Sequence, residues 1–371
     1  MQFILGLDLT ERFFREVVQP LLAQHFPGLA YAAARIGSGS EVLGFDTEMS
    51  TDHDWGPRFH LFLTEDAYAR WQTAVTDTLR HHLPPTFLGY STHYAPNEEG
   101  TNLLQPHSGG SINHRVEVVT VRQFCRDYLS YDPAEPFTTT DWLTTPQQLL
   151  LGVTAGRVFV DQVGELTAVR HQLTYYPHDI WLYLMATQWG RIGQEQPFVG
   201  RAGIVGDEIG SQLLAGRLVH DVMQLAFFQA RRYAPYPKWF GSGFAQLPQA
   251  ASLTPYLTVA LAATNWHDRE AALTAAFQQL AHHHNKLGIT DPVPTELEWF
   301  HERPFRILNE APIMTALFNA VNDPTLKAIP HHVGSIDQFS HSSDLRSTPH
   351  LRHLLKALYE PSPKHLPEMS E

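Results

Sequence analysis

The sequence predicts an α+β protein, in which a mixed β-sheet with flanking helices is followed by an all-α helical bundle. Up to about Tyr176, short apolar or alternating runs typical of strands alternate with amphipathic helical runs. From Pro177 onward, the chain consists of long runs with helical periodicity. The final segment is rich in His, Pro and Ser, a composition typical of a loosely packed tail. We therefore expect domains at residues 1–176 and 177–330, and a C-terminal tail at residues 331–371.

Local patterns give the order of elements in the first domain. Asp8 and Glu11 have the spacing of a capping box and precede an apolar face of helical period, so a helix is expected to begin there. A second helix is expected to end before Pro84, because proline disrupts a helix. Strands are expected in the apolar or alternating segments 29–37, 52–63, 113–121 and 156–166.

The second domain is expected to contain long helices, because apolar residues recur with helical period over residues 178–192, 210–233, 253–266 and 269–284. Trp181, Trp189 and Phe228 are expected in its core rather than as platforms for stacked bases. Two histidine runs, at residues 282–284 and 331–332, resemble metal tracts. Adjacent residues on a helix point to different sides, so we expect these histidines on a solvated surface.

Composition limits the classes of function. The 371 residues include 26 Lys and Arg against 38 Asp and Glu, and this acidic balance argues against a general nucleic-acid-binding protein. The single cysteine, Cys125, excludes an intramolecular disulfide and favours a reducing compartment. The N-terminal residues have no basic leader, and no run of about 18 apolar residues occurs. We therefore expect a cytoplasmic protein without a membrane span.

The stretch that carries chemistry joins a Gly-Ser pair to two aspartates. On a strand, Asp52 and Asp54 would point to the same face, where two carboxylates repel one another unless a cation lies between them. Hard oxygen ligands at this spacing suit Mg²⁺, which prefers a few carboxylates together with substrate phosphates and water. Gly39 allows the backbone to approach a phosphate closely, and Ser40 adds a hydroxyl donor. The pattern therefore predicts a metal and phosphate site.

This pattern resembles the signature of the nucleotidyltransferase superfamily, the fold of DNA polymerase β and of aminoglycoside nucleotidyltransferases. In that signature, Gly-Ser precedes an Asp-x-Asp on the next strand, and small-molecule members have a further glycine at the position of Gly44. The resemblance covers residues 29–121 at motif level, and the string at 37–57 also resembles an uncharacterised bacterial branch. The gap from Ser40 to Asp52 is slightly longer than usual. The resemblance implies a nucleotidyltransferase-like mixed sheet in the first domain.

The resemblance also implies a two-metal reaction. The superfamily uses a third carboxylate on a neighbouring central strand, and Glu117 is the candidate because it is the acid inside the alternating segment 113–121. Asp52, Asp54 and Glu117 would then hold two Mg²⁺ ions, with Glu117 binding one metal or acting as general base. The substrate would be a nucleoside triphosphate, with ATP expected first. Its monophosphate would pass to a hydroxyl of a small molecule or of another protein.

Phosphate contacts are expected from the glycine-rich turn and from the helical domain. Gly37 and Ser38 are the alternative to Gly39 and Ser40 for the turn that approaches the triphosphate. Lys238, in a loop between proline and tryptophan, is expected to reach triphosphate oxygens across an interdomain cleft, as is Arg201. For Lys238 the alternative is a solvated lysine beside a packed tryptophan.

Two other functions stay open. His-Asp dipeptides are typical of HD-type metal phosphohydrolases, and they occur at residues 53–54, 178–179, 220–221 and 267–268. Such sites need their histidines and aspartates on helices that converge on one metal. The other alternative is a catalytically inactive nucleotide-binding or regulatory protein of the same fold. A Glu117 far from the two aspartates, or an acidic pair facing open solvent, would favour it. For Glu117 itself, the alternative role is that of a partly buried acid paired with Arg115 or His114.

Overall fold

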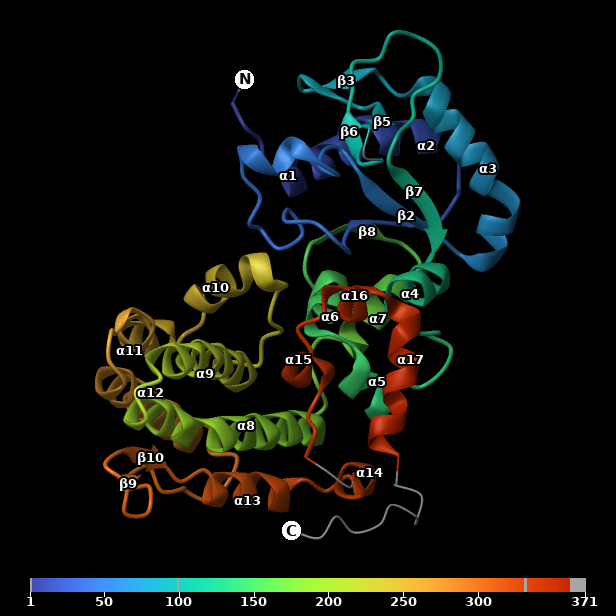
Figure 1. Cartoon of the computed structure of the whole chain (residues 1–371). Coiled ribbons are helices and arrows are strands. Elements are labelled where there is room, and N and C mark those ends of the chain that lie inside the picture. The colour runs from blue at the N-terminus through green and yellow to red at the C-terminus, as the bar shows by residue number, and fades with distance from the viewer. Residues whose placement is uncertain (1, 99, 330–331, 361–371) are drawn as a thin grey trace. The chain divides into compact units, whose positions relative to one another are not determined.

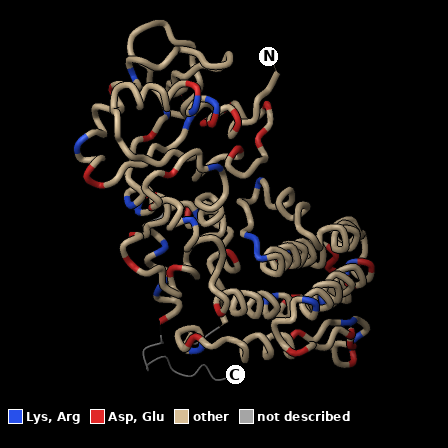
Figure 2. The backbone as a smooth tube through the Cα atoms, turned by 180° about the vertical axis from the view of Figure 1, so that it is seen from behind, with Lys and Arg blue, Asp and Glu red and all other residues tan. Residues whose placement is uncertain are grey.

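The computed structural model describes residues 2–98, 100–329 and 332–360, and the chain forms two compact units (Figure 1). The first unit comprises Met1–Phe137 and Gln148–Thr174, and the second comprises Thr138–Gln147 and Tyr175–Glu371. The chain therefore passes between the units at three places rather than once near residue 176. Figure 2 shows acidic and basic positions interspersed along the backbone of both units.

A four-stranded mixed sheet forms the centre of the first unit. Its strand order is β7-β2-β1-β8; β1 runs antiparallel to both β2 and β8, whereas β2 and β7 are parallel. The strands span β1 (Ala32–Arg35), β2 (Phe59–Leu63), β7 (Val116–Thr120) and β8 (Arg157–Asp161). Each lies within one of the four segments predicted from periodicity, and the mixed sheet is confirmed.

The second strand begins later than expected. Asp52 and Asp54 were expected on it, but β2 starts only at Phe59. Gly56 has a φ of +133°, a backbone conformation that suits glycine and interrupts a strand, and Pro57 has no N–H to donate to a ladder. The prediction that the two aspartates share a strand face is therefore wrong.

Helices and two short hairpins surround the sheet. The helices are α1 (Gly6–Phe13), α2 (Gln19–His25), α3 (Glu65–His82), α4 (Val121–Leu129), α6 (Gln147–Thr154) and α7 (Glu165–Gln172), with a π-helical segment at Phe14–Val18 and a 3₁₀ turn, η2, at Glu48–Asp52. The hairpins pair β3 (Thr86–Phe87) with β4 (Tyr90–Ser91) and β5 (Tyr94–Pro96) with β6 (Asn102–Leu104).

The ends of α1 and α3 test the expected helix signals. The expected capping box at Asp8 is wrong, because α1 already begins at Gly6 and Leu5 occupies the N-cap without a side-chain hydrogen bond. Helix α3 ends at His82, before Pro84, as expected.

Strand β2 has a different environment on each face. Phe59 contacts Phe14 and Phe159 at ring-centroid distances of 5.6 and 5.9 Å, in the aromatic core beneath α1. His60 points to the opposite face, because successive strand residues alternate, and its ring lies 5.0 Å from that of Phe124 on α4. The α4 face of the sheet therefore carries a histidine in an otherwise aromatic setting.

The second unit consists mainly of helices. They are α5 (Thr139–Thr144), α8 (His178–Ile204), α9 (Glu208–Gln229), α10 (Pro237–Ala245), α11 (Ala250–Ala262), α12 (Trp266–Leu287), α13 (Ala311–Ala320), α14 (Pro324–Lys327), α15 (Ile336–Phe339), α16 (Ser343–Ser347) and α17 (Arg352–Leu355), with 3₁₀ turns at Pro349–Leu351 and Lys356–Tyr359. A two-stranded sheet, β9 (Leu297–Trp299) with β10 (Arg306–Leu308), makes the expectation of an all-α domain wrong in detail. The expected burial of Trp181, Trp189 and Phe228 is confirmed.

Two further expectations for the second unit need correction. The segment expected to be a loose tail is packed over residues 332–360, because the Gln338 amide donates to the Leu184 carbonyl and Tyr359 is buried. Residues 361–371 lie outside the described part of the chain. His284 is buried on α12 rather than solvated, while His331 lies outside the described residues.

No helix within residues 2–98, 100–329 and 332–360 combines the length and the hydropathy needed to cross a membrane.

Candidate functional site

A cavity of about 190 Å³ lies at one edge of the sheet in the first unit. Because β1 runs antiparallel to β2 while β7 runs parallel to it, the end of β1 and the beginnings of β2 and β7 meet at the same edge. Most of the polar residues that line the cavity come from these places: Arg35 and Ser38 at the end of β1, Arg58 and His60 at the start of β2, and Arg115 and Glu117 at the start of β7. Tyr128 lines the cavity from α4. Sheet topology therefore gathers residues from three distant parts of the chain.

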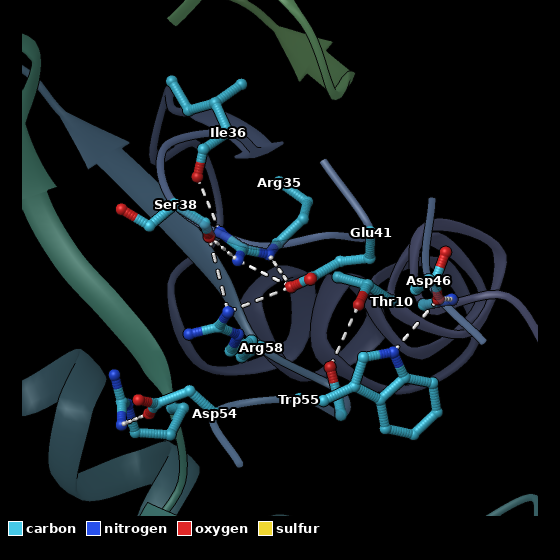
Figure 3. A network of polar contacts seen from close by, with 12 residues as sticks. Thr10, Arg35, Ile36, Ser38, Glu41, Asp46, Asp54, Trp55 and Arg58 are labelled. Carbon is cyan, nitrogen blue, oxygen red and sulfur yellow. Dashed lines mark hydrogen bonds and ion pairs between the residues drawn. The ribbon is translucent and has the colours of Figure 1, made fainter. Parts of the chain in front are cut away.

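A buried ion triad borders the cavity, because Arg35 and Arg58 both line it; Figure 3 shows the contacts of the triad. The Glu41 carboxylate oxygen Oε1 accepts from Arg35 Nε at 2.9 Å, from Arg35 Nη2 at 2.6 Å and from Arg58 Nη2 at 3.0 Å. The side chains of Arg35 and Glu41 are each 3% exposed, and that of Arg58 is 13% exposed. Two guanidinium groups thus share one carboxylate, so the three side chains together carry a net charge of +1 and are largely shielded from bulk water.

The neighbouring charges shift the pKa values of the triad. Burial, followed by the like charge of Arg58, lowers the pKa of Arg35. Burial acts to raise the pKa of Glu41, but the charges of Arg35 and Arg58 outweigh it, so that pKa lies below its usual value. In addition, Arg58 Nε is buried without a hydrogen-bond partner among the described residues. A buried cationic donor of this kind favours an anionic ligand, because an isolated buried charge is costly.

The glycine-rich loop is held by this triad. The Ser38 carbonyl accepts from Arg35 and, at 3.4 Å, from Arg58 Nη2. Gly39 has a φ of +138°, and a Cβ there would lie 2.4 Å from a Glu41 carboxylate oxygen and 2.7 Å from Arg35 Nη2. Glycine is therefore required at position 39 both for its backbone conformation and for the close approach of the ion pair.

The structure distinguishes the roles of the two Gly-Ser pairs. Gly37 and Ser38 line the cavity, whereas Gly39 packs against the triad. The Ser40 carbonyl accepts from the Phe45 amide at 3.0 Å and closes a turn. Gly44 lies in the same turn with a φ of +72°, and a Cβ there would meet nothing within 4 Å. Gly39, Ser40 and Gly44 thus shape the loop that presents Gly37 and Ser38.

The three predicted acids separate into a pair and an outlier. Asp52 ends η2, is 67% exposed, and lies 2.7 Å from His53 Nδ1 through its Oδ1. Asp54, which has a φ of +45°, accepts from Arg115 Nη1 at 3.1 Å, and Glu117 on β7 accepts from Arg115 Nη2 at 3.3 Å. Asp54 and Glu117 are therefore brought together by one guanidinium, and Asp52 takes no part in that contact.

Glu117 also contacts the histidine of the neighbouring strand. It pairs with His60 in the β2–β7 register, and His60 Nε2 lies 3.4 Å from Glu117 Oε2. The hydrogen bond with His60, opposed by burial and assisted by Arg115, lowers the pKa of Glu117 to about 2. Burial lowers the pKa of His60, whose Nδ1 is buried without a hydrogen-bond partner in the described part of the chain.

The residues as arranged do not form the expected metal site. In the part of the chain that the structure describes, no three His, Cys, Asp or Glu side chains are grouped so that they could hold a metal ion. Arg115 lies where a cation would bridge Asp54 and Glu117. The two Mg²⁺ ions stay a prediction. For the same reason, the His-Asp dipeptides do not converge, within the described residues, on a group that could hold the metal of an HD-type phosphohydrolase.

Lys238 and Arg201 belong to the second unit. Lys238 lies in the first turn of α10, with its Nζ 5.1 Å from the ring centroid of Trp239. Arg201 lies in the last turn of α8, where its guanidinium carbon is 5.4 Å from the Phe198 ring centroid. Both side chains are exposed, and their expected contacts with a triphosphate stay predictions.

Sequence reasoning missed Arg35 and Arg58, but it named Arg115 as a possible partner of Glu117, and the structure confirms that pair. Arg35 ends a strand of alanines, Arg58 precedes an apolar strand, and Arg115 precedes another. A charge at the boundary of a strand predicted to be buried is the signal that could have found them, because such charges need partners. Their convergence on one carboxylate or one cavity could not be read from a local pattern.

Comparison with known proteins gives a match to one family model and matches to three chains among solved structures, one of which is described here. The model of a domain of unknown function, DUF4037, matches residues 142–240. No curated protein matches the chain at a significant level. A crystal structure of a nucleotidyltransferase-like protein from Exiguobacterium sibiricum matches 79% of this chain and 83% of its own, at 11% sequence identity and a TM-score of 0.31. A TM-score this low supports no argument about this chain, so the function is argued below from the site.

Proposed function

We propose that the first unit binds the phosphate groups of a nucleoside triphosphate in the cavity, and that the protein is a nucleotidyltransferase. It would transfer a nucleoside monophosphate, AMP from ATP, to a hydroxyl of a small molecule or of another protein. The observation that carries this proposal is the Arg35–Glu41–Arg58 triad, in which two guanidinium groups share one carboxylate beside a cavity bordered by a glycine-rich loop. A phosphate group can accept several hydrogen bonds from guanidinium donors.

Each cavity residue has a role in this proposal. Arg58 lines the cavity and would donate from its guanidinium to a phosphate oxygen, and the small Gly37 would let the ligand approach the backbone. Arg115, which also lines the cavity, would bind a second oxygen. Arg35 is already engaged by Glu41 and by the carbonyls of Ile36 and Ser38, so we assign it to hold the loop rather than the ligand.

The proposed reaction is an in-line displacement at phosphorus. The acceptor hydroxyl oxygen would form a bond to the α-phosphorus, the bond from that phosphorus to the bridging oxygen would break, and pyrophosphate would leave. A carboxylate with a pKa of about 2 is a weak proton acceptor, which argues against Glu117 as the general base. We assign the acceptor proton to His60, which lines the cavity beside Glu117 and whose pKa is lowered by burial.

One observation favours the second candidate, a catalytically inactive nucleotide-binding or regulatory protein. Arg115 pairs with both Asp54 and Glu117, and Asp52 is exposed to solvent, so the acids are not assembled for metal chemistry. In that case the cavity would bind the triphosphate, but no transfer would follow. The two candidates share the binding site and differ only in turnover.

The first experiment measures binding by calorimetry. ATP, GTP, CTP and UTP are titrated with and without Mg²⁺ into the wild type, into Arg58→Met and into Arg12→Met. Arg12 is the matched control, because its guanidinium also pairs with a carboxylate but is half exposed on α1. We expect Arg58→Met to weaken binding by about tenfold or more, the loss of one charge-assisted hydrogen bond, and Arg12→Met to leave it unchanged. Absence of triphosphate binding by the wild type would refute the proposed function.

A second experiment separates the enzyme from the regulator. ATP labelled at the α-phosphate is incubated with the protein and with either a metabolite extract or a protein extract. Label that appears in a new product, and that is lost with His60→Gln, supports transfer. Nucleotide binding without labelled product in either extract would favour the inactive protein.

A further inference from the structure

Arg115 bridges two of the acids that were expected to hold a divalent cation. Its two terminal nitrogens lie 3.1 Å from Asp54 Oδ1 and 3.3 Å from Glu117 Oε1, so one guanidinium is shared by carboxylates from two segments that are distant in sequence. Guanidinium and Mg²⁺ compete for the same oxygen atoms, since both need carboxylates that are ionised and close together. The carboxylates therefore have a protein-supplied cation in place of a metal.

We propose that Arg115 is a built-in competitor that keeps a divalent cation off Asp54 and Glu117 until an anion in the cavity draws its guanidinium away. The anion-binding half of this statement rests on the proposed function, whereas the competition with a cation does not. Arg115 lines the cavity, so its guanidinium has an alternative partner within the same site. Binding of an anion and binding of a cation would then strengthen one another, because each favours the state in which the bridge is open.

The exposure of the bridge makes this exchange feasible. The side chains of Arg115, Asp54 and Glu117 are 24%, 43% and 47% exposed, so both ion pairs are partly screened by water and are weak. By contrast, the Glu41 carboxylate is buried against two arginines and is not available to a cation. Opening the bridge therefore leaves the buried triad intact.

The backbone keeps Asp54 in place when Arg115 moves. The Asp54 amide donates to the Asn102 carbonyl at 3.0 Å, which fixes the loop in its left-handed conformation. Glu117 is fixed by the β2–β7 register. Arg115 itself packs over the Tyr94 ring at 5.9 Å, so a methionine at this position would keep the apolar contact of the stem while removing the charge.

The test uses Mn²⁺ alone, without nucleotide. Free Mn²⁺ is measured by electron paramagnetic resonance in titrations of the wild type, Arg115→Met, and Arg115→Met combined with Asp54→Asn. We expect Arg115→Met to bind Mn²⁺ about tenfold more tightly than the wild type, the gain from losing two partly exposed ion pairs. The added Asp54→Asn should remove the gain. Circular dichroism verifies that the variants are folded.

A matched control comes from a second bridging arginine. Arg157 Nη1 lies 2.9 Å from Asp8 and 2.8 Å from Glu11, outside the cavity. In Arg157→Met, Arg15 still pairs with Glu11, so only one carboxylate loses its cation and Mn²⁺ affinity should not rise. An equal gain in Arg157→Met, or no gain in Arg115→Met, overturns the competition.

Coupling to an anion is measured with sulfate, which binds Mn²⁺ weakly in solution. In the wild type, sulfate should tighten Mn²⁺ binding relative to chloride at equal ionic strength, whereas in Arg115→Met the effect should be smaller. A sulfate effect that is absent in the wild type, or equal in both proteins, overturns the coupling. Because no nucleotide is used, these results are independent of whether ATP binds.

Discussion

Glutamate 41 offers a direct test of the buried triad, through the isosteric change Glu41→Gln. The change keeps the side-chain volume but removes the negative charge shared by Arg35 and Arg58. Three hydrogen bonds of 2.6 to 3.0 Å end on one oxygen of this carboxylate, and two guanidinium groups would be left facing a neutral amide. The free energy of unfolding should fall, because the buried positive charges would repel one another without compensation.

The magnitude follows from burial. Removing one partner of a buried ion pair costs about 3 to 5 kcal/mol, and the remaining amide acceptor favours the lower end, so we expect about 3 kcal/mol. Glu16→Gln is the matched control, because Glu16 accepts from Arg12 Nε at a similar 2.8 Å but on the exposed surface of the helical N-terminal segment. Its loss should cost at most about 0.5 kcal/mol.

The assay is urea-induced unfolding of the full chain, followed by circular dichroism. Combining Glu41→Gln with Arg58→Met should cost less than the sum of the two single changes. The triad carries a net charge of +1 in the wild type and +2 in Glu41→Gln, and the double variant returns it to +1. If Glu41→Gln and Glu16→Gln destabilise the protein equally, or if the double variant is strictly additive, the triad is not the coupled buried unit described here.

Two predictions concern the glycine turn and a buried histidine. Gly39→Ala should destabilise the protein by about 2 kcal/mol or more, through its φ of +138° and the 2.4 Å approach of its Cβ to Glu41, whereas Gly44→Ala, with open space around it, should cost only about 1 kcal/mol. Equal thermal shifts of the two variants would contradict this difference. Burial lowers the pKa of His284 to about 4, so the unfolded chain binds this proton at higher pH than the folded chain. The free energy of unfolding should therefore not depend on the titration of His284 above its unfolded pKa of about 6.5. As the pH falls from there towards 4, the free energy of unfolding should decrease by up to roughly 3 kcal/mol. Urea midpoints of the wild type and His284→Gln between pH 7.5 and 4 measure this decline, and identical pH profiles would contradict it.

The sequence by itself determined the elements that depend on local periodicity. Strands β1, β7 and β8 and helices α3, α8 and α12 lie where apolar residues recur with the period of a strand or a helix. A period of two or of 3.6 residues is a property of neighbouring positions, so it can be read without knowing the tertiary contacts. The sequence also predicted that the glycine-rich loop and Glu117 belong to a functional site, and Gly37, Ser38 and Glu117 do line the cavity.

Local patterns failed where a backbone conformation or a distant partner decided the outcome. Asp52 and Asp54 have strand spacing, but a 3₁₀ turn and a left-handed residue keep them off β2. The C-terminal segment has the composition of a tail, yet Gln338 is buried in a hydrogen-bond network with residues more than a hundred positions away. Composition does not report such contacts, because a polar side chain is buried only when its partners come from elsewhere in the chain.

Only the tertiary structure decided which charged residues come together at the candidate site. Arg35, Glu41 and Arg58 are unremarkable in sequence, and they become a buried triad only because β1 and β2 pair antiparallel and bring the ends of two segments to one edge. Arg115 reaches Asp54 through the parallel pairing of β2 with β7, whereas Glu117 lies only two residues from Arg115 along the chain. Electrostatic energies depend on distance and burial, which strand pairing sets and residue spacing does not.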